Sequence, residues 1–299
     1  MAALSTSVVI KLQASDCKGG NHTANLRRIM AYLRATALIL ASLLFLCLAP
    51  LQWVALRRRW PLRLLLPVAF SRTLATLLRL DVVTESAKLP EGPRLIVANH
   101  LSWLDIVAVC CIEPVCFLAK REIGSWPICS TFARLQETVF VDRQRRRSIP
   151  GANAAMAQRM LAGRPMLLFP EATTGDGSAL RKFHSSHLAA ARDLLAKADW
   201  VDKVWVQPVA IRYSTPTAAW FGDATLLPHL WAVLKGEPIR CDLVFGKPLA
   251  YARGENRKVI TGHAASAIAG MLASMARAIE PDLAARAETP AFDPLAANS

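Results

Sequence analysis

His100 and Asp105 are the two side chains in this sequence whose types and spacing best suit acid–base chemistry. Residues five apart on an ideal helix lie about 140° out of phase, since each residue turns about 100°. The pair therefore meets only if His100 lies in a loop and Asp105 in the first turn of the next helix. Ser102 and Asp105 have the Ser-x-x-Asp spacing of a capping box, which predicts that this helix starts at Ser102. The plainer alternative is that Asp105 only caps the helix and His100 is an ordinary loop residue.

Two further groups of polar residues follow short apolar runs later in the chain. Asp142-Arg143 ends the first run, and Glu171 comes after Phe169-Pro170 in the second. An arginine at a strand end can hold an anionic group through two parallel hydrogen bonds. Pro170 fixes φ and interrupts strand pairing, which predicts that Glu171 points away from the end of the sheet. The alternatives are a solvated basic loop and an ordinary strand–turn loop.

Short apolar runs alternate with helical stretches from residue 94 onward. This alternation predicts an α/β fold with a mixed, mostly parallel sheet flanked by helices. The predicted strands are 94–98, 115–119, 138–141, 166–169, 204–211 and 240–245, and the predicted helices are 102–111, 124–134, 148–162, 185–198 and 256–279. Pro208 inside a predicted strand indicates an edge or a bulge. Ligands bind beyond the carboxyl ends of strands in open α/β sheets, so His100, Arg143 and Glu171 are expected to share one site.

The apolar N-terminal part of the chain predicts attachment to a membrane. Residues 35–56 contain no charged side chain, and at about 1.5 Å per residue this segment spans the roughly 30 Å hydrocarbon core. Pro50 is expected to kink or break the helix, and Arg57 to Trp60 to anchor it at the interface. Residues 61–80 predict an amphipathic helix on the membrane surface. Basic residues on both sides of the apolar segment favour a hydrophobic helix pair that dips into one leaflet, and a single span or a buried hairpin is the alternative.

These patterns divide the chain into four parts. We expect a flexible extension at 1–29, membrane-associated helices at 30–82, an α/β domain at 83–280 and a disordered tail at 281–299. The apolar segment comes too late in the chain for a good signal peptide, and no small-residue cleavage site clearly follows it. We therefore expect the helices at 30–82 to remain part of the protein.

Charge and composition favour a membrane-surface protein over a nucleic-acid binder. The formal net charge is +14, and 53% of the residues are hydrophobic, while the aromatic residues do not alternate with Lys and Arg as base-stacking platforms do. No nucleic acid is expected as a partner. The seven cysteines indicate mostly buried, reduced thiols, with Cys110 or Cys111 as an acyl-carrying nucleophile in the alternative. No metal is expected, since His184 and His187 lack a Glu or Cys partner.

The motifs together resemble those of the glycerolipid acyltransferase family, whose best-known bacterial members are 1-acyl-sn-glycerol-3-phosphate acyltransferases. The resemblance covers residues 65–250 and rests on four blocks in a fixed order. These blocks are Asn99-His100-x4-Asp105, Phe140-Val141-Asp142-Arg143, Phe169-Pro170-Glu171 and Val206-Gln207-Pro208-Val209. One block is weak support, whereas four blocks in order are specific.

The resemblance implies acyl transfer from an acyl-carrier-protein or coenzyme A thioester to a lipid hydroxyl, with no other cofactor. His100 would be the general base on that hydroxyl, and Asp105 would orient the imidazole. The implied substrate-binding residues are Asn99, Lys120, Arg143, Glu171, Thr173 and Thr174. The implied partners are the acyl donor, a lysolipid acceptor and the bilayer. The implied location is the bacterial inner membrane, with the active site facing the cytoplasm.

The third block departs from the family pattern. It reads Glu171-Ala172-Thr173-Thr174, where the family usually has Glu-Gly-Thr, often followed by Arg. The absent Arg removes a bidentate partner for a phosphate, and Ala for Gly is tolerated unless the backbone needs a positive φ. Further matches around Trp103 and from Thr173 to Gly177 resemble the lyso-ornithine lipid O-acyltransferase subgroup. That subgroup's acceptor is the 3-hydroxyl of an amide-linked fatty acid on ornithine, which we expect here, with lysophosphatidic acid as the alternative.

Overall fold

The computed structural model describes residues 4–85, 89–142 and 145–287, with side chains in these ranges except at 4–24, 127–128 and 278–287. The helices are α1 (Leu4–Cys47), α2 (Ala49–Arg57), α3 (Leu62–Leu78), α4 (Leu104–Ile112), α5 (Pro127–Leu135), α6 (Ile149–Leu161), α7 (Ala189–Lys197), α8 (Leu226–Lys235) and α9 (Arg257–Ala287). The strands are β1 (Leu80–Glu85), β2 (Arg94–Ala98), β3 (Cys116–Lys120), β4 (Val139–Val141), β5 (Met166–Leu168), β6 (Lys203–Tyr213), β7 (Ile239–Phe245) and β8 (Leu249–Ala252).

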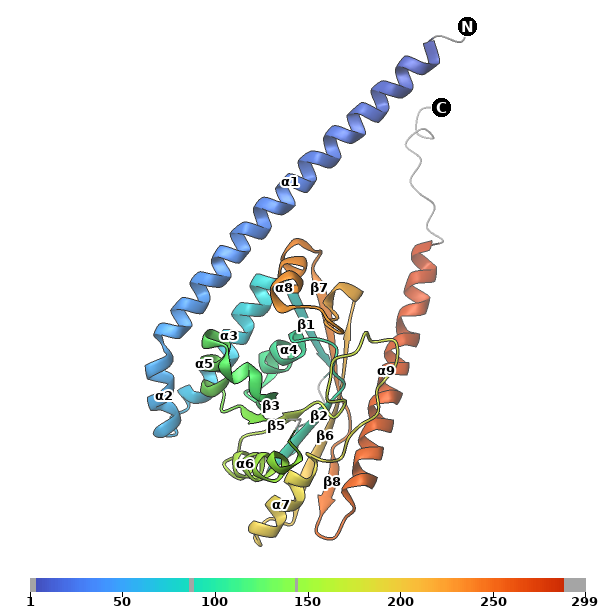
Figure 1. Cartoon of the computed structure of the whole chain (residues 1–299). Helices are drawn as coiled ribbons and strands as arrows, with labels where there is room; N and C mark the ends of the chain where they lie inside the picture. Colours follow the sequence, from blue (N-terminus) through green and yellow to red (C-terminus); the bar gives the residue numbers. More distant parts are fainter. Residues whose placement is uncertain (1–3, 86–88, 143–144, 288–299) are drawn as a thin grey trace.

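The strands form a mixed, mostly parallel sheet with helices on both faces, as the sequence predicts (Figure 1). The order across the sheet is β1-β7-β6-β2-β5-β3-β4, and β8 pairs with β6. Neighbours from β6 to β4 in this order pair in parallel, whereas β6 is antiparallel to β7 and β8. The carboxyl ends of β6, β2, β5, β3 and β4 therefore lie at one edge of the sheet.

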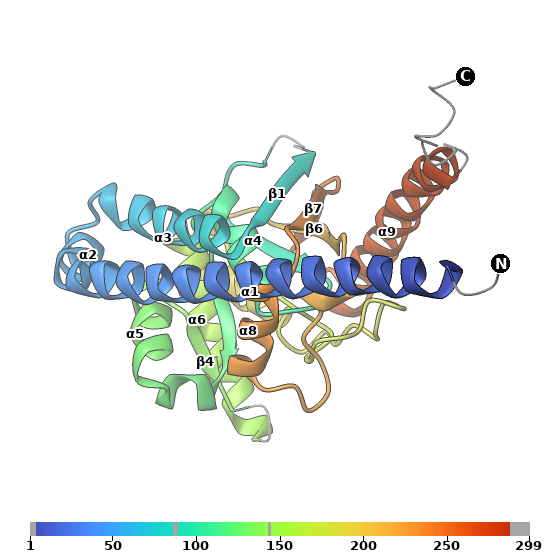
Figure 2. The same cartoon turned by 90° about the horizontal axis from the view of Figure 1, so that it is seen from above.

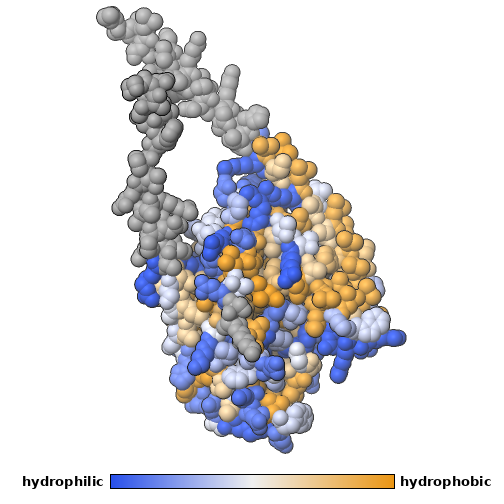
Figure 3. Space-filling view, turned by 180° about the vertical axis from the view of Figure 1, so that it is seen from behind, coloured by the Kyte–Doolittle hydropathy of each residue, from blue (hydrophilic) through white to orange (hydrophobic). Residues whose placement is uncertain are grey.

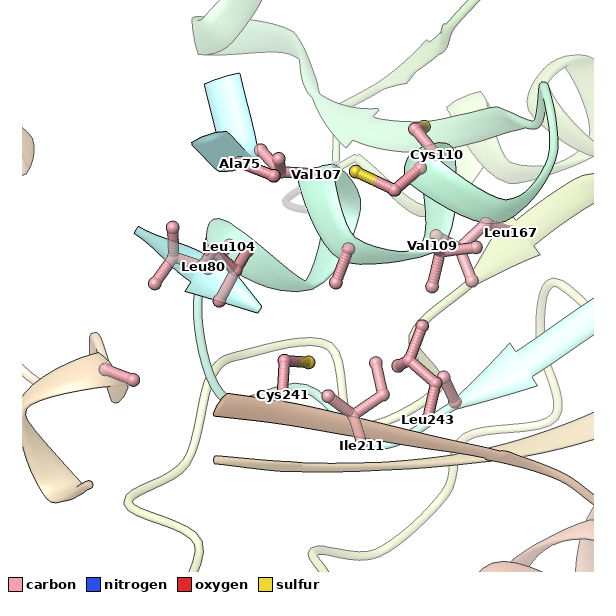
Figure 4. Close-up of a cluster of buried hydrophobic side chains, with 14 of the residues drawn as sticks. Ala75, Leu80, Leu104, Val107, Val109, Cys110, Leu167, Ile211, Cys241 and Leu243 are labelled. Carbon is pink, nitrogen blue, oxygen red and sulfur yellow. The ribbon is translucent and has the colours of Figure 1, made fainter. Parts of the chain in front are cut away.

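The centre of the sheet is buried on both faces because successive side chains of a strand point to opposite sides. In β2, Ile96 and Ala98 belong to a core that also contains residues of α3, α4 and α8. Leu95 and Val97 belong to a second core with residues of α6, α7 and α9. Figure 4 shows the first core, where side chains of α4 meet those of β5, β6 and β7. This packing holds β2 on both sides and fixes the start of the loop that follows it.

All the predicted strands and helices of the α/β domain are present, some with shifted ends, and β2 has the predicted bounds. α5 begins at Pro127 rather than at residue 124, because proline is favoured in the first turn of a helix. The sequence patterns did not predict β1, β8 or α8. β1 starts at Leu80 and pairs with β7. The sheet therefore begins inside the segment 30–82 that the sequence assigns to membrane-associated helices.

Pro208 lies in a central strand, so its predicted place on an edge strand is wrong. β8 pairs with residues 203–206 of β6, and β7 pairs with residues 209–213. Pro208 falls between these two partners, where its missing N–H interrupts neither ladder. Its carbonyl oxygen accepts a hydrogen bond from the Gly246 N–H at 2.9 Å.

Both ends of the chain are more helical than the sequence predicts. Residues 4–29 belong to α1, where a flexible extension is expected. The sequence has no proline before Pro50, so no missing N–H interrupts the helix, and α1 continues through Gly19 and Gly20 and ends at Cys47, just before that proline. α9 continues past Pro281 to Ala287 because this segment is rich in strong helix formers. The rest of the predicted disordered tail, 288–299, lies outside the described residues.

Helix α1 packs against the domain along one side and exposes apolar residues along the other. Ala31 is fully buried, the Arg34 guanidinium donates to the Leu234 carbonyl at 3.1 Å, and the rings of Tyr32 and Trp231 lie 4.9 Å apart. The exposed side carries Leu26, Ile29, Met30, Leu33, Ile39, Leu40, Leu43 and Leu44. Figure 2 shows α1 lying across the domain, and Figure 3 shows hydrophobic residues gathered along this side of the molecule.

Among the described residues, two helical stretches are apolar and long enough to cross a membrane by length and composition, Asn25–Cys47 within α1 and Arg257–Arg277 within α9. Only 6% of the most apolar stretch of α1 is buried inside the protein. In α9, Ile260, Ala264 and Ile268 cover the second core, so this helix belongs to the domain. α3 also belongs to the domain, because Ala75 and Leu78 are buried in the first core. α3 is therefore part of the domain as well as the surface helix that the sequence predicts. α1, in contrast, exposes apolar residues along one side.

Candidate active site

The shared edge of the parallel strands brings most of the predicted site residues close in the fold. His100 follows β2, Glu171 follows β5 and Lys120 ends β3, and these strands are adjacent in the order β2-β5-β3. β6 lies on the other side of β2 and ends at Tyr213. Arg143 follows β4, but it lies outside the residues that the structure describes. This edge is where ligands bind in open α/β sheets.

His100 lies in the loop after β2, and Asp105 lies in the first turn of α4, which is the arrangement that their spacing predicts. Nδ1 of His100 is 2.8 Å from Oδ2 of Asp105. The Asp105 side chain is fully buried, while 17% of the His100 side chain is exposed. The carboxylate is thus shielded from water, and the imidazole keeps access to the edge of the sheet.

Asp105 collects hydrogen bonds from four donors. Oδ2 accepts from the backbone N–H groups of Leu101 at 2.7 Å and Ser102 at 2.9 Å as well as from His100, and Oδ1 accepts from the Tyr213 hydroxyl at 2.7 Å. A carboxylate only accepts, so this contact places the proton of a neutral His100 on Nδ1 and the lone pair on Nε2. This tautomer is the one that a general base needs.

Tyr213 is a site residue that the sequence reading missed. Burial and the neighbouring Asp105 charge hold the pKa of Tyr213 well above its usual value of 10, so its hydroxyl stays protonated and donates. Tyr213 is the last residue of β6, and it shares a face with Val209 and Ile211, which belong to the first core. The signal in the sequence is this alternation, which carries the side chain toward α4 at the end of the strand.

Only half of the predicted capping box at Ser102 forms. α4 begins at Leu104, with Trp103 as its N-cap residue, and the Trp103 side chain makes no cap bond. The Asp105 carboxylate accepts from the Ser102 N–H at 2.9 Å, which is one of the two bonds of a capping box. The other bond is missing, because the Ser102 hydroxyl is buried with no hydrogen-bond partner among the described residues. The Asp105 carboxylate thus orders the loop that carries His100.

The loop after β5 holds the backbone of His100 from both sides. Oε1 of Glu171 accepts from the His100 N–H at 2.8 Å, and the Gly175 N–H donates to the His100 carbonyl at 2.8 Å. The Phe169 ring stacks on the imidazole with centroids 3.9 Å apart and planes 10° apart. Three contacts from one loop therefore set the position and the plane of His100.

Two of the predicted substrate-binding residues also have structural partners. Oε2 of Glu171 accepts from the Arg181 N–H at 3.1 Å, so both oxygens of Glu171 bond to backbone groups, and burial raises the pKa of this carboxyl. Asn99 donates to the Ile211 carbonyl at 2.9 Å and accepts from the Ile211 N–H at 2.8 Å. Glu171 therefore holds the backbone of His100, and Asn99 joins the end of β2 to β6. The predicted contact of both residues with substrate stays a prediction.

The remaining predicted residues lie at the rim of the site. Thr173 and Lys120 are exposed, and Thr174 is half-buried. Ala172 has φ of 63°, which is the left-handed conformation that favours glycine. The backbone at this departure from the family pattern therefore does need a positive φ, and Ala172 carries the strain.

A cysteine nucleophile does not fit the structure. Cys110 and Cys111 lie in α4 and are buried. Burial raises the pKa of Cys110 to about 12 and that of Cys111 to about 11. Both thiols are therefore protonated near neutral pH and are poor nucleophiles.

Comparison with known proteins gives one family, whose members are named for different lipid acceptors. The family model described as Acyltransferase matches residues 81–212. The chain is 36% identical over 244 residues to a lyso-ornithine lipid O-acyltransferase of Brucella abortus, covering 78% of this chain and 90% of that protein. It is 35% identical to a protein of the same name from Rhizobium meliloti, and that match covers 81% of this chain and 83% of the Rhizobium protein. A 1-acyl-sn-glycerol-3-phosphate acyltransferase of Neisseria meningitidis is 35% identical, and that match covers 52% of this chain and 61% of the Neisseria protein.

The fold resembles that of a solved structure. The crystal structure of the 1-acyl-sn-glycerophosphate (LPA) acyltransferase PlsC from Thermotoga maritima matches with a TM-score of 0.55. The match covers 84% of this chain and 97% of the other, at 18% sequence identity. At this identity the likeness shows a shared fold and carries nothing about the acceptor.

Proposed function

The chain belongs to the acyltransferase family, and from this premise we propose that it is a lyso-ornithine lipid O-acyltransferase. It transfers a fatty acyl group from an acyl-carrier-protein or coenzyme A thioester to the 3-hydroxyl of the amide-linked fatty acid on ornithine. The identity to two relatives of that name over most of their length supports this acceptor. The observation that carries the reaction type is the His100–Asp105 pair, with Nε2 of His100 free to take a proton.

In the proposed reaction His100 acts as a general base. Nε2 removes the proton from the acceptor hydroxyl as its oxygen attacks the thioester carbonyl. A C–O bond forms, the C–S bond breaks, and the proton passes from the imidazolium to the departing thiolate. Asp105 stabilises the transient imidazolium and keeps its proton on Nδ1, with no acyl-enzyme between the steps.

The head group of the acceptor finds partners of both charges on the loop after Glu171. The Arg181 N–H bonds to the same carboxylate as the His100 N–H, and the Arg181 side chain lies over Gly175, where a Cβ would be 3.4 Å from its Nε. Asp176 is exposed nearby, and hydrogen bonds from Ser178 lower the pKa of its carboxyl. Arg181 and Asp176 complement the carboxylate and the ammonium of ornithine. Lys120, Thr173, Thr174 and Arg143 remain proposed contributors to binding of the acceptor.

We place the protein on the cytoplasmic face of a bacterial inner membrane. The Arg34–Leu234 hydrogen bond joins α1 to α8, and the Arg27–Glu237 ion pair at 2.8 Å joins α1 to the loop after α8. A helix held along the domain in this way presents only its outer side to lipid, which supports the proposal that it dips into one leaflet rather than crossing the bilayer. The cationic and aromatic residues that follow α2 would lie at the interface, where Arg58 stacks over Trp60.

An acceptor panel tests the proposed function. The full chain is purified in detergent and offered acyl-carrier-protein thioester with lyso-ornithine lipid, its carboxyl methyl ester or lysophosphatidic acid. We expect transfer to lyso-ornithine lipid and a higher KM for the ester. Arg181→Ala should raise KM for lyso-ornithine lipid about tenfold and leave KM for the ester unchanged, with Lys182→Ala as the matched control. Acylation of lysophosphatidic acid alone would establish the second candidate, which the Neisseria relative favours.

A further inference from the structure

Trp103 ties the loop of the His100–Asp105 pair to helix α8. Trp103 lies between the two residues of the pair and is the N-cap residue of α4. Its indole Nε1–H donates to Nδ1 of His229 at 3.0 Å, although the two residues are 126 positions apart in the sequence. The rings meet edge to face, with centroids 6.2 Å apart and planes 82° apart.

The two ring nitrogens of His229 have partners of opposite kind. An indole N–H only donates, so Nδ1 must accept. Nε2 lies 3.1 Å from the carbonyl oxygen of Ala219, which only accepts, so Nε2 must donate. Neutral imidazole with its proton on Nε2 is the form that satisfies both partners. Burial lowers the pKa of His229, which also favours the neutral form.

A second bond joins the same two segments. The Trp220 N–H donates to the Leu101 carbonyl at 2.8 Å, so residues 219–229 contact the loop 101–103 at two points. α8 is itself anchored, because Val233 and Leu234 are buried in the first core. The segment is therefore a rigid support for the loop that carries the pair.

We propose that His229 is a positioning residue for acyl transfer. It fixes the indole of Trp103, and through it the first turn of α4, so that the Asp105 carboxylate stays against His100. The Trp103 side chain makes no cap bond to the backbone of α4, and its bond to His229 fixes this N-cap residue against α8. The inference rests on the proposed acyl transfer, and it gives a role to a histidine outside the four motifs.

Substitutions at His229 and Trp103 test this role in the full-length protein in detergent. We expect His229→Leu to lower kcat about fivefold with little change in KM, the effect of losing one net hydrogen bond of about 1 kcal/mol at 1.36 kcal/mol per tenfold. His229→Gln should recover most of the rate, because its amide oxygen can accept from Trp103 while its amide nitrogen donates to Ala219. The exposed His263 gives the control His263→Leu, which should match wild type.

The pairwise nature of the contact separates positioning from a general loss of packing. Trp103→Phe removes the indole donor without touching α8, so it tests the inference even if His229→Leu fails to fold. The double variant should be no slower than the slower single variant. Additive losses, or a wild-type kcat in His229→Leu, would overturn the inference.

A spectroscopic readout keeps this test apart from the proposed function. With 15N-labelled histidine and tryptophan, NMR of the wild type should show His229 as the neutral Nε2–H tautomer and a downfield indole proton for Trp103. The indole signal should move in His229→Leu and not in His263→Leu. If no offered acceptor is acylated, the proposed function fails while these spectra still decide the contact. A His229 protonated on Nδ1 at neutral pH would refute the inference.

Discussion

Asp105→Asn isolates the charge of the buried carboxylate from its geometry. The asparagine oxygen can take the place of Oδ2 and accept from His100, Leu101 and Ser102. The amide NH2 then faces the Tyr213 hydroxyl, which can turn to accept in place of donating. The loop therefore keeps its hydrogen bonds, and what is lost is the negative charge beside the imidazolium.

The size of the effect follows from the separation and the burial of the pair. The nearest atoms are 2.8 Å apart and the Asp105 side chain is fully buried, so the charge centres lie about 4 Å apart at an effective dielectric constant of about 20, worth about 4 kcal/mol. At 1.36 kcal/mol per tenfold, kcat should fall about 10³-fold. KM should change little, because Asp105 is out of reach of the substrate.

The assay is the initial rate of acyl transfer to lyso-ornithine lipid, with the melting temperature of each variant as a folding control. Tyr213→Phe is the comparison, because it removes one donor and keeps the charge, and we expect about a tenfold loss of kcat. A folded Asp105→Asn that keeps kcat within tenfold of wild type would refute the reasoning. An equal loss in Tyr213→Phe would show that geometry, not charge, dominates.

Three further predictions concern stability. Ala172→Gly should raise the melting temperature by about 2 °C. Relief of the left-handed strain at Ala172, about 1–2 kcal/mol, exceeds the cost of the entropy that glycine adds to the unfolded chain. An unchanged or lower melting temperature would contradict the strain. Arg94→Ala should destabilise by about 3–5 kcal/mol in urea unfolding, because it strands the buried Glu113 carboxyl, whereas the double change of both residues to Met should be near neutral. Burial lowers the pKa of His229 in the folded protein below 6.5, so on acidification the unfolded state binds the proton first. The stability that neutral His229 contributes is therefore complete above pH 6.5. It is lost as the pH falls from 6.5 toward the pKa of the folded protein. The melting temperature of His229→Gln should therefore fall less than that of wild type over this acid range. Parallel plots of melting temperature against pH for the two proteins would count against a neutral, buried His229.

The local pattern of the sequence determined the pair and most of the elements. Strand and helix periods are properties of neighbouring residues, so the bounds of β2 and the start of a helix near Asp105 follow from the residues themselves. The spacing of His100 and Asp105 excluded a shared helix face, which left the loop-to-helix arrangement that is observed. The order of the four motifs identified the family.

Only the tertiary structure decided which side chains support the pair. Tyr213 reaches Asp105 from 108 residues away, and Trp103 meets His229 across 126. Asn99 and Glu171 sit in the matching motifs, and only the structure shows that they also bond to the backbones of other segments. Such contacts depend on strand order and on the packing of both faces of the sheet. The alternation along β6 indicates the face of the sheet on which Tyr213 lies, but neighbouring residues do not indicate which side chain it meets, so these contacts appear only once the chain has folded.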